Sequence, residues 1–146
     1  MKEIIIASGN KGKIRETQEI LNEYKVISMN ELGIDIDVEE DQNTFEGNAI
    51  KKAETIAKKI GGKMCIADDS GIEIEFLDGF PGVVTKRWHS GTDRERNLAI
   101  IEKLKGVPKE KRKITFTTAI ALSNGETTIC EKGTIEGFVA ENPTRR

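Results

Sequence analysis

The sequence predicts an α/β fold, and three observations support this prediction. An apolar run over residues 3–8 leads through a polar turn into a helical pattern over 11–23. A second helical pattern, over 44–60, leads into another apolar run. Two long β-rich runs then flank Asn124-Gly125, a dipeptide that strongly favours a hairpin turn. Strand patterns that alternate with helical patterns are typical of α/β proteins.

Composition predicts one soluble domain, residues 1–146, rather than a disordered chain. Hydrophobic residues make up 36% and charged residues 33% of the sequence, which suits a globule with a modest core. The formal net charge is −2, so any affinity for polyphosphate must come from locally clustered Lys and Arg. A nucleic-acid polymer is not an expected partner, because such binders are usually more basic.

The sequence also predicts a cytoplasmic location. No apolar run approaches ~18 residues, so neither a membrane span nor a membrane partner is expected. The N-terminus enters a strand pattern directly and leaves no room for a signal peptide. Cys65 and Cys130 lie in apparent strands and are expected to be free, buried thiols. A zinc site is not expected, since His89 is the only histidine.

The first strand, at 3–8, is followed by the turn Ser8-Gly9-Asn10-Lys11-Gly12-Lys13 and by the helix over 11–23. The backbone N–H groups at the start of this helix and the charge of Lys13 form a candidate phosphate site. Neither a Walker A sequence nor a GxGxxG sequence is present, so an ordinary strand-to-helix turn stays an open alternative.

A second strand is expected at 24–29. The segment that follows it is acidic over residues 35–41. Most of these acids are expected to lie in a solvated loop. One of Glu39 or Glu40 is a candidate metal ligand, because hard divalent cations take carboxylate oxygens.

The helix over 44–60 is expected to begin at a cap made by Asn43 and Glu46. Projected at 100° per residue, Asn48 and Lys52 lie on the border of its apolar stripe. They are therefore placed to face a cleft. A lysine that snorkels at the edge of the core is the alternative for Lys52.

The pentapeptide Ala67-Asp68-Asp69-Ser70-Gly71 carries two adjacent carboxylates directly after the apolar run at 64–67. We expect a strand to end here and a turn to follow. Neighbouring carboxylates repel each other, and Mg²⁺ suits a site made of one or two carboxylates plus substrate phosphates. A solvated Asp-Asp-Ser-Gly turn is the alternative that these residue types also favour.

Three basic or aromatic residues, Lys86, Arg87 and Trp88, follow a loop rich in Gly and Pro at 77–84. They either hold phosphate and stack on a base or form a packed indole flanked by surface charge. The packed indole is the favoured interpretation for Trp88.

The remaining pattern is regular. Thr92 and Glu95 are expected to cap a helix that ends at Gly106, and the basic run at 109–113 is expected to be solvated. Further strands are expected over 72–76, 114–122 and 126–139.

Three segments together resemble the Ham1/RdgB-type inosine triphosphate pyrophosphatases, which clear non-canonical purine nucleotides. The turn at 8–13 is similar to S/T-x-N-x-x-K, and residues 44–53, TFEGNAIKKA, are similar to TFxxNAxxKA. Residues 67–71 with Gly79-Phe80-Pro81-Gly82-Val83 and Arg87 are similar to ADDSGLxVxxLxGxPGxxSxR. The segments occur in the family's order and spacing, and the resemblance extends to Gly137.

The resemblance implies an activity and an architecture. The implied reaction is Mg²⁺-dependent hydrolysis of ITP, dITP and XTP to the monophosphate and pyrophosphate. The implied fold is a long twisted mixed β-sheet flanked by helices, with two lobes around a central nucleotide cleft. The implied partners are the purine nucleoside triphosphate and, since homodimers are usual in the family, a second copy of the chain.

The resemblance also implies a role for each candidate residue. Asp69 would be the general base and a metal contact, supported by Asp68, while Glu39 or Glu40 would hold Mg²⁺. Lys52 would bind phosphate. The remaining substrate contacts would be Ser8, Gly9, Asn10, Lys11, Gly12, Lys13, Asn48, Ser70, Lys86 and Arg87.

The resemblance weakens after Gly137, where the family continues into PRGxxGFGYDPIF and a later SHR motif that help to form the purine pocket. Residues 141–146 begin to resemble this region and then end. We therefore expect a domain that is incomplete at its C-terminus, with poor base recognition. A catalytically weak or inactive nucleotide-binding remnant is the main alternative function, and a metal-dependent phosphomonoesterase is a third.

Overall fold

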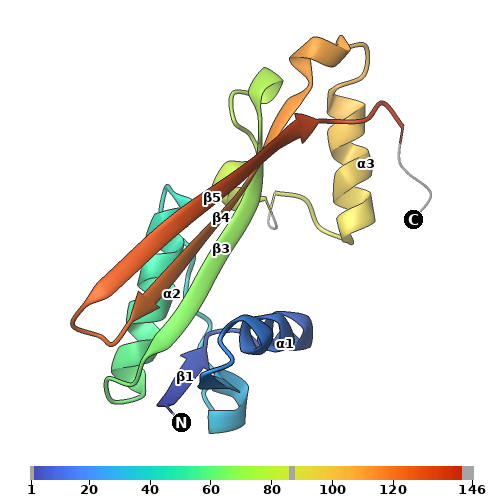
Figure 1. Ribbon diagram of the computed structural model, residues 1–146. Coiled ribbons are helices and arrows are strands. Elements are labelled where there is room, and N and C mark those ends of the chain that lie inside the picture. Colours follow the sequence, from blue (N-terminus) through green and yellow to red (C-terminus); the bar gives the residue numbers. More distant parts are fainter. Residues whose placement is uncertain (1, 86–87, 143–146) are drawn as a thin grey trace. The chain divides into compact units, whose positions relative to one another are not determined.

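The fold was determined as a computed structural model, which describes residues 2–85 and 88–142 (Figure 1). Three α-helices and five strands follow one another along the described chain in the order β1-α1-β2-α2-β3-α3-β4-β5, with four short 3₁₀ helices between them. Their bounds are β1 Lys2–Ile6, α1 Lys11–Ile20, β2 Tyr24–Ser28, α2 Phe45–Lys59, β3 Cys65–Ile74, α3 Asp93–Lys103, β4 Lys113–Ser123 and β5 Thr128–Phe138. The helices and most of the strands expected from the sequence are present, with ends that differ by a few residues, but the expected strands at 64–67 and 72–76 are one continuous strand, β3.

The five strands form one mixed sheet in the order β2-β1-β3-β4-β5. β1 runs parallel to both of its neighbours, and its Ile5 is paired with Ile27 of β2 and with Cys65 of β3. β4 and β5 are joined by the four residues 124–127, which is enough only for an antiparallel hairpin. Gly125 has φ +93° there, as expected for the glycine of an Asn-Gly turn. The predicted α/β fold with a mixed sheet is confirmed.

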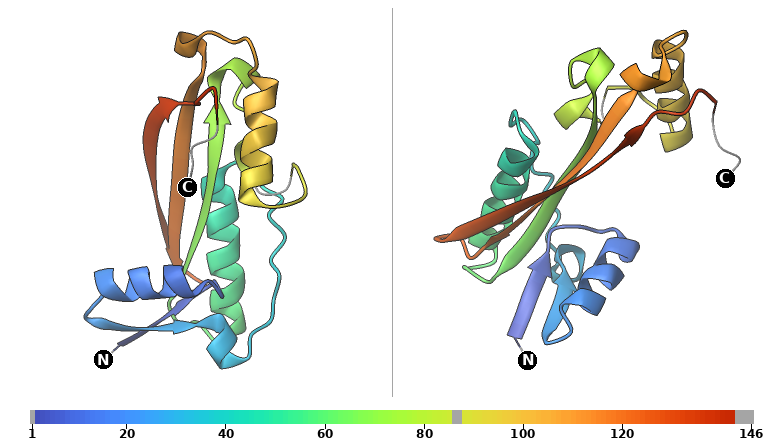
Figure 2. Two further views of the ribbon diagram at one scale, coloured as in Figure 1. Left: turned by 90° about the vertical axis from the view of Figure 1, so that its right-hand side faces the viewer. Right: turned by 45° about the horizontal axis from the view of Figure 1, so that its top comes forward.

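α1 and α2 cover opposite faces of the sheet (Figure 2). The connection through α1 steps from β1 to β2, whereas the connection through α2 steps back across β1 to β3. Both are crossovers between parallel strands, which are right-handed almost without exception. Two right-handed crossovers that step in opposite directions place their helices on opposite faces.

β3 corrects the strand end that we expected at the Asp68-Asp69 pair. The strand continues without a turn from Cys65 to Ile74. Successive side chains of a strand point to opposite faces, so Asp69 shares a face with buried Ala67, while Asp68 shares the other face with half-buried Ile66. The extended backbone thus separates the two carboxylates and removes the repulsion that a turn would have imposed.

The helix caps were predicted with mixed success. Thr92 and Glu95 form the expected capping box at the start of α3. At α2 the cap is Thr44 rather than Asn43, because the Thr44 hydroxyl accepts a hydrogen bond from the backbone N–H of Gly47, three residues on. The error is one residue, and both residue types are good caps.

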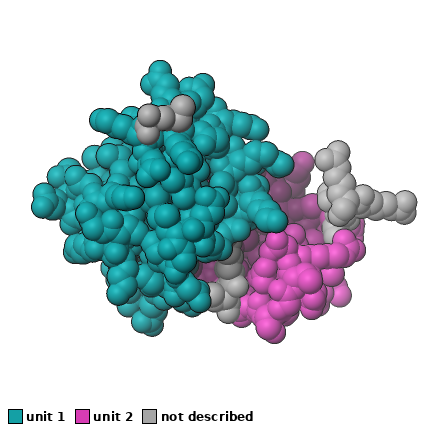
Figure 3. Space-filling view, turned by 90° about the horizontal axis from the view of Figure 1, so that it is seen from below, with its two compact units in different colours: residues 1–69, 119–132 teal, residues 70–118, 133–146 magenta. Residues whose placement is uncertain are grey.

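The chain divides into two compact units, residues 1–69 with 119–132 and residues 70–118 with 133–146 (Figure 3). β3, β4 and β5 each contribute one half to each unit. The first unit buries residues of β1, β2, α2 and the start of β3, among them Ile5, Ala49, Ala53, Ile56 and Cys65. The second unit buries a separate cluster: Ile72, Ile74, Ile100 and Leu104.

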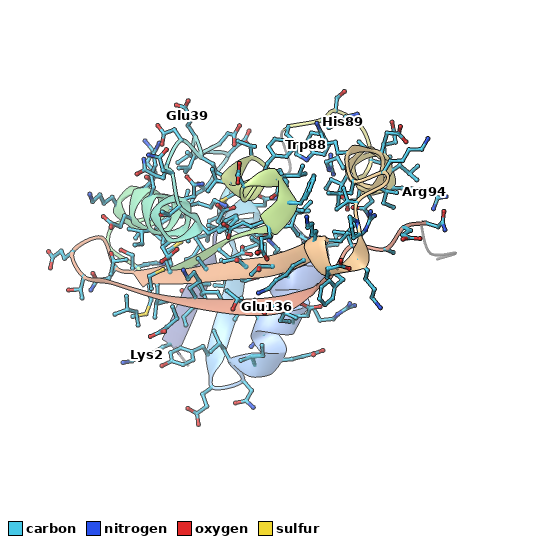
Figure 4. All side chains as sticks on the ribbon, turned by 90° about the horizontal axis from the view of Figure 1, so that it is seen from above. Lys2, Glu39, Trp88, His89, Arg94 and Glu136 are labelled. Carbon is cyan, nitrogen blue, oxygen red and sulfur yellow. The ribbon has the colours of Figure 1, made fainter. Side chains whose placement is uncertain are left out.

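Trp88 packs against the apolar cluster of the second unit. Its indole meets the Phe80 ring edge to face, with 5.2 Å between ring centroids, and the Lys103 ammonium lies 5.8 Å from its centre. Figure 4 shows His89 beside it. These contacts agree with the packed-indole interpretation of Trp88. Lys86 and Arg87 lie outside the described residues.

None of the helices in the described part of the chain has the length and apolar character needed to span a bilayer.

The two cysteines differ in their exposure, and this difference predicts their reactivity. Cys65 is completely buried, and burial raises the pKa of its thiol to about 12, whereas Cys130 in β5 is only half-buried. Alkylation requires the thiolate and access to it. Iodoacetamide is therefore expected to modify Cys130 well before Cys65 in the native protein, as measured by peptide mass spectrometry. The two cysteines are expected to react at equal rates only after denaturation. Equal alkylation rates in the native protein would contradict the buried position of Cys65.

Candidate active site

The turn at 8–13 joins β1 to α1 and is held by its own polar side chains. Asn10 caps α1, since its side-chain oxygen accepts the backbone N–H of Lys13 at 3.1 Å. The Asn10 N–H donates to the Ser8 hydroxyl at 3.1 Å, and the Ser8 carbonyl accepts from Ser28 of β2. The N–H groups of Lys11 and Gly12, in the first turn of the helix, have no intrahelical acceptors. They form the kind of helix start that binds phosphate.

Gly9 lies close to the side chain of Asn30. A Cβ at this position would lie 2.5 Å from the side-chain nitrogen of Asn30, which follows β2. The absence of a side chain lets the backbone of the turn approach the neighbouring segment, and it leaves the turn exposed on its other side.

Lys13 extends from the first turn of α1 to β3. Its ammonium donates to both carboxylate oxygens of Asp68, at 2.9 and 3.1 Å. Both side chains are partly exposed, so the pair is accessible to a ligand. Residues 55 positions apart in the sequence therefore meet at one point, as the candidate site requires.

Lys52 reaches the same strand from α2. Its ammonium donates to the backbone carbonyl of Asp68 at 3.0 Å and pairs with the carboxylate of Glu40 at 2.9 Å. The Lys52 side chain is only 19% exposed, so this ion pair is partly shielded from water. Lysines from α1 and α2 thus converge on Asp68, one on its carboxylate and the other on its carbonyl.

Asn48 and Asp69 form a buried contact one helical turn before Lys52. The side-chain amide of Asn48 donates to the Asp69 carboxylate at 3.0 Å. Asn48 is 1% and Asp69 8% exposed. The amide oxygen of Asn48 accepts the backbone N–H of Gln42 at 2.9 Å. Asn48 was expected at the border of a cleft, and it instead lies inside the first unit.

The acidic loop, residues 35–42, distinguishes the two candidate metal ligands. Glu40 is half-buried and reaches Lys52, whereas the Glu39 side chain is exposed and points away from the ribbon in Figure 4. The backbone carbonyl of Glu39 accepts a hydrogen bond from the Lys51 ammonium at 2.8 Å. The same ammonium binds Asp41, and this bond, with one from Gln42, lowers the pKa of the Asp41 carboxyl.

A cavity of about 180 Å³ lies next to the Lys52–Glu40 pair. Its lining comes from the residue after β1, from the short 3₁₀ helix after β2, from the acidic loop and from α2: Ala7, Met29, Ile36, Asp37, Val38, Glu40, Lys52 and Ile56. Among residues 2–85 and 88–142, no group of three or more His, Cys, Asp or Glu side chains is close enough to hold a metal without other ligands. A divalent ion here would take its remaining ligands from water or from a substrate.

The remaining expected site residues are Ser70, which follows Asp69 in β3, and two residues that the structure does not describe. Ser70 belongs to the second unit, where its hydroxyl lies 3.1 Å from that of Thr118. Lys86 and Arg87 fall outside the described residues. Sequence analysis missed Gln42, whose contribution is a backbone N–H, and Asn30, which lies against Gly9. No side-chain pattern signals either role, because both depend on how loops pack.

Comparisons with known proteins agree on one family. The family model described as "Ham1 family" matches residues 4–146. The chain is 45% identical, over 148 residues, to the dITP/XTP pyrophosphatase of Bacillus subtilis (strain 168), a match that covers 98% of this chain and 74% of that protein. The solved structure of a HAM1 protein from Coxiella burnetii superimposes with a TM-score of 0.89 at 37% identity, covering 99% of this chain and 76% of that one.

A second solved structure, of the Staphylococcus aureus Ham1 protein, has a TM-score of 0.87 at 40% identity and covers 96% of this chain and 73% of that one. The chain thus spans about three quarters of the length of each of these relatives.

Proposed function

The chain belongs to the Ham1 family, and from this premise we propose that it hydrolyses non-canonical purine nucleoside triphosphates such as dITP and XTP to the monophosphate and pyrophosphate. Its curated relatives are dITP/XTP pyrophosphatases at 37–45% identity. The family match spans both compact units, which supports treating residues 1–146 as parts of one domain.

The convergence of Lys13 and Lys52 on Asp68 is the observation that carries this proposal. Cleavage between the α- and β-phosphates requires cations over the phosphates, because negative charge develops on the leaving pyrophosphate. The two ammonium groups each lie within hydrogen-bonding distance of an atom of Asp68. They are therefore near enough to each other to bind neighbouring phosphates of a single triphosphate. The turn at 8–13 adds backbone N–H groups beside Lys13.

Without substrate, both lysines are neutralised by carboxylates. Lys13 pairs with Asp68 and Lys52 with Glu40, each at 2.9 Å. An arriving triphosphate offers each lysine a more highly charged partner. We expect both lysines to move to the phosphates and to release the two carboxylates, so that substrate binding prepares the acidic groups for a metal ion.

Mg²⁺ fits Glu40, which this exchange would release from Lys52, together with the neighbouring strand carboxylate Asp69. It favours one or two carboxylates together with substrate phosphates, and Glu40 and Asp69 would hold it. Glu40 is preferred to Glu39 because it already faces Lys52 and the cavity. When bound, the ion supplies positive charge to the phosphate oxygens.

Asp69 is assigned as the general base that orients and deprotonates the attacking water. Its carboxylate is largely buried and accepts a hydrogen bond from the Asn48 side chain. Asp68 supports the site by holding Lys13 in place before substrate binds. The turn that leads to Lys13 is assigned to binding the triphosphate. Its residues are Ser8, Gly9, Asn10, Lys11 and Gly12.

Three assays of the purified chain test this function. Incubation with dITP, XTP and dATP, with and without Mg²⁺, is expected to release pyrophosphate from dITP and XTP only with the metal. Release of orthophosphate would indicate the phosphomonoesterase alternative. Nucleotide binding without turnover, measured by calorimetry, would indicate the inactive remnant instead.

A homodimer and a cytoplasmic location remain predictions of the sequence, and gel filtration with light scattering tests the first of them.

Lys52→Ala is expected to raise the KM for dITP by about 10–100-fold, since one charge-assisted contact to phosphate is lost. Steady-state kinetics at saturating Mg²⁺ measures the effect. Lys59→Ala is the matched control, because Lys59 is an exposed lysine near the end of the same helix. An unaltered KM in Lys52→Ala would show that Lys52 does not bind the phosphates.

A further inference from the structure

Asn48 links two segments through the two ends of its side-chain amide. The nitrogen donates to the Asp69 carboxylate on β3, and the oxygen accepts the backbone N–H of Gln42 at the end of the acidic loop. Both distances, 3.0 and 2.9 Å, are those of well-formed hydrogen bonds. At 1% exposure, the side chain has almost no contact with solvent.

The chemistry of the two partners fixes the orientation of this amide. A backbone N–H can only donate, so the atom of Asn48 that faces Gln42 must be the oxygen. A carboxylate accepts, so the atom that faces Asp69 must be the nitrogen. Aspartate at position 48 keeps the acceptor for Gln42 but loses the donor to Asp69, and alanine loses both.

The acidic loop is held to the same helix at further points. Lys52, one turn after Asn48 on α2, binds Glu40 of the loop and the carbonyl of Asp68. The loop also packs closely on the helix start, where a Cβ at Gly47 would lie 2.9 Å from Gln42 Cβ. α2 therefore fixes the loop that carries Glu40 and the strand that carries Asp69 relative to each other.

We propose that Asn48 is a positioning residue, which holds the Asp69 carboxylate and the acidic loop in register and does not contact the nucleotide. The inference rests on the proposed function, because it assigns Asp69 as the general base. It also replaces the substrate contact that the family resemblance implied for Asn48, since both ends of the buried amide are already bound within the protein.

Kinetics separates the two roles of Asn48. A residue that acts through Asp69 changes kcat, whereas a residue that binds the nucleotide changes KM. Asn48→Ala and Asn48→Asp are each expected to lower kcat for dITP by about 10–100-fold, the range for loss of a supporting hydrogen bond, with little change in KM. Asn97→Asp is the matched control, since Asn97 is an exposed asparagine of α3. A raised KM with an unchanged kcat would overturn the proposal, as would unchanged values of both constants.

A second measurement does not depend on activity. Amide hydrogen exchange followed by NMR is expected to show a protected Gln42 N–H in the wild type and in Asn48→Asp, and a rapidly exchanging one in Asn48→Ala. Three-bond couplings of Asp69 are expected to report one χ1 rotamer in the wild type and averaging in both variants. If the wild type hydrolyses no purine triphosphate but these NMR results hold, the proposed function fails and the linkage stands. If Gln42 and Asp69 are unaffected by Asn48→Ala, the linkage itself is wrong.

Discussion

Asp69→Asn is expected to reduce kcat for dITP by about 10²–10⁴-fold while the protein stays folded, the range expected for a missing general base. Asparagine keeps the size of the side chain but cannot accept the proton of the attacking water. The substituted amide can still meet Asn48, because its oxygen accepts as the carboxylate does. Steady-state release of pyrophosphate measures turnover, and thermal unfolding followed by circular dichroism reports on folding.

The matched control is Glu73→Gln, the same chemical change at an exposed carboxylate of the same strand, and its turnover is expected to match the wild type. Unchanged turnover in folded Asp69→Asn would exclude Asp69 as the base. Loss of folding in Asp69→Asn would instead show that the carboxylate is needed for the structure. Asp69→Ser, which removes the carboxylate and reduces the volume of the side chain, would then separate loss of folding from loss of catalysis. The readout is the residual turnover of its folded fraction.

Arg112→Ala is expected to lower the free energy of unfolding by about 2–4 kcal/mol, which is large for a single substitution. The Arg112 guanidinium is 2% exposed and donates to four backbone carbonyls: Leu104 at 2.6 Å, Val107 at 3.3 Å, Val139 at 2.9 Å and Ala140 at 2.9 Å. These carbonyls belong to the end of α3 and to the segment after β5. Removal of the guanidinium leaves these carbonyls without this donor, in surroundings that are buried at Leu104 and partly buried at the other three, and it also removes a cation near a helix C-terminus.

Urea unfolding measures this change, with Arg94→Ala as the control, since Arg94 lies exposed on α3 and its side chain is labelled in Figure 4. The control is expected to stay within about 0.5 kcal/mol of the wild type. Arg112→Lys is expected to fall between the two, because an ammonium keeps the charge but cannot reach four acceptors in a plane. A loss below about 1 kcal/mol in Arg112→Ala would show that the carbonyls find water or other donors.

The elements of the fold were predictable because their signals are local. Apolar periodicity, Asn124-Gly125 and the Thr92/Glu95 capping box each specify structure within a few residues, and the strands and helices formed where they indicated. The strand end at Asp68-Asp69 was wrong because Asp, Ser and Gly favour turns locally, whereas here the ladder to neighbouring strands keeps them extended.

The candidate site was only partly predictable, because its contacts join distant segments. Lys13, Lys52 and Asp68 were identified as residues, but their contacts depend on α1 and α2 lying on opposite faces of the sheet. The choice between Glu39 and Glu40 required the path of a loop that has no regular structure. Arg112 was expected in a solvated basic run, and nothing in that run distinguishes the one cation that is buried.

A crystal structure of the protein with Mg²⁺ and an α,β-methylene analogue of inosine triphosphate tests the central claim most directly. The analogue cannot be cleaved at the proposed bond, so the bound state persists. We predict that the phosphates contact Lys13 and Lys52, that both lysines have left Asp68 and Glu40, and that the metal lies on Glu40 and Asp69. A nucleotide bound elsewhere, with the Lys13–Asp68 and Lys52–Glu40 pairs still at 2.9 Å, would contradict the account.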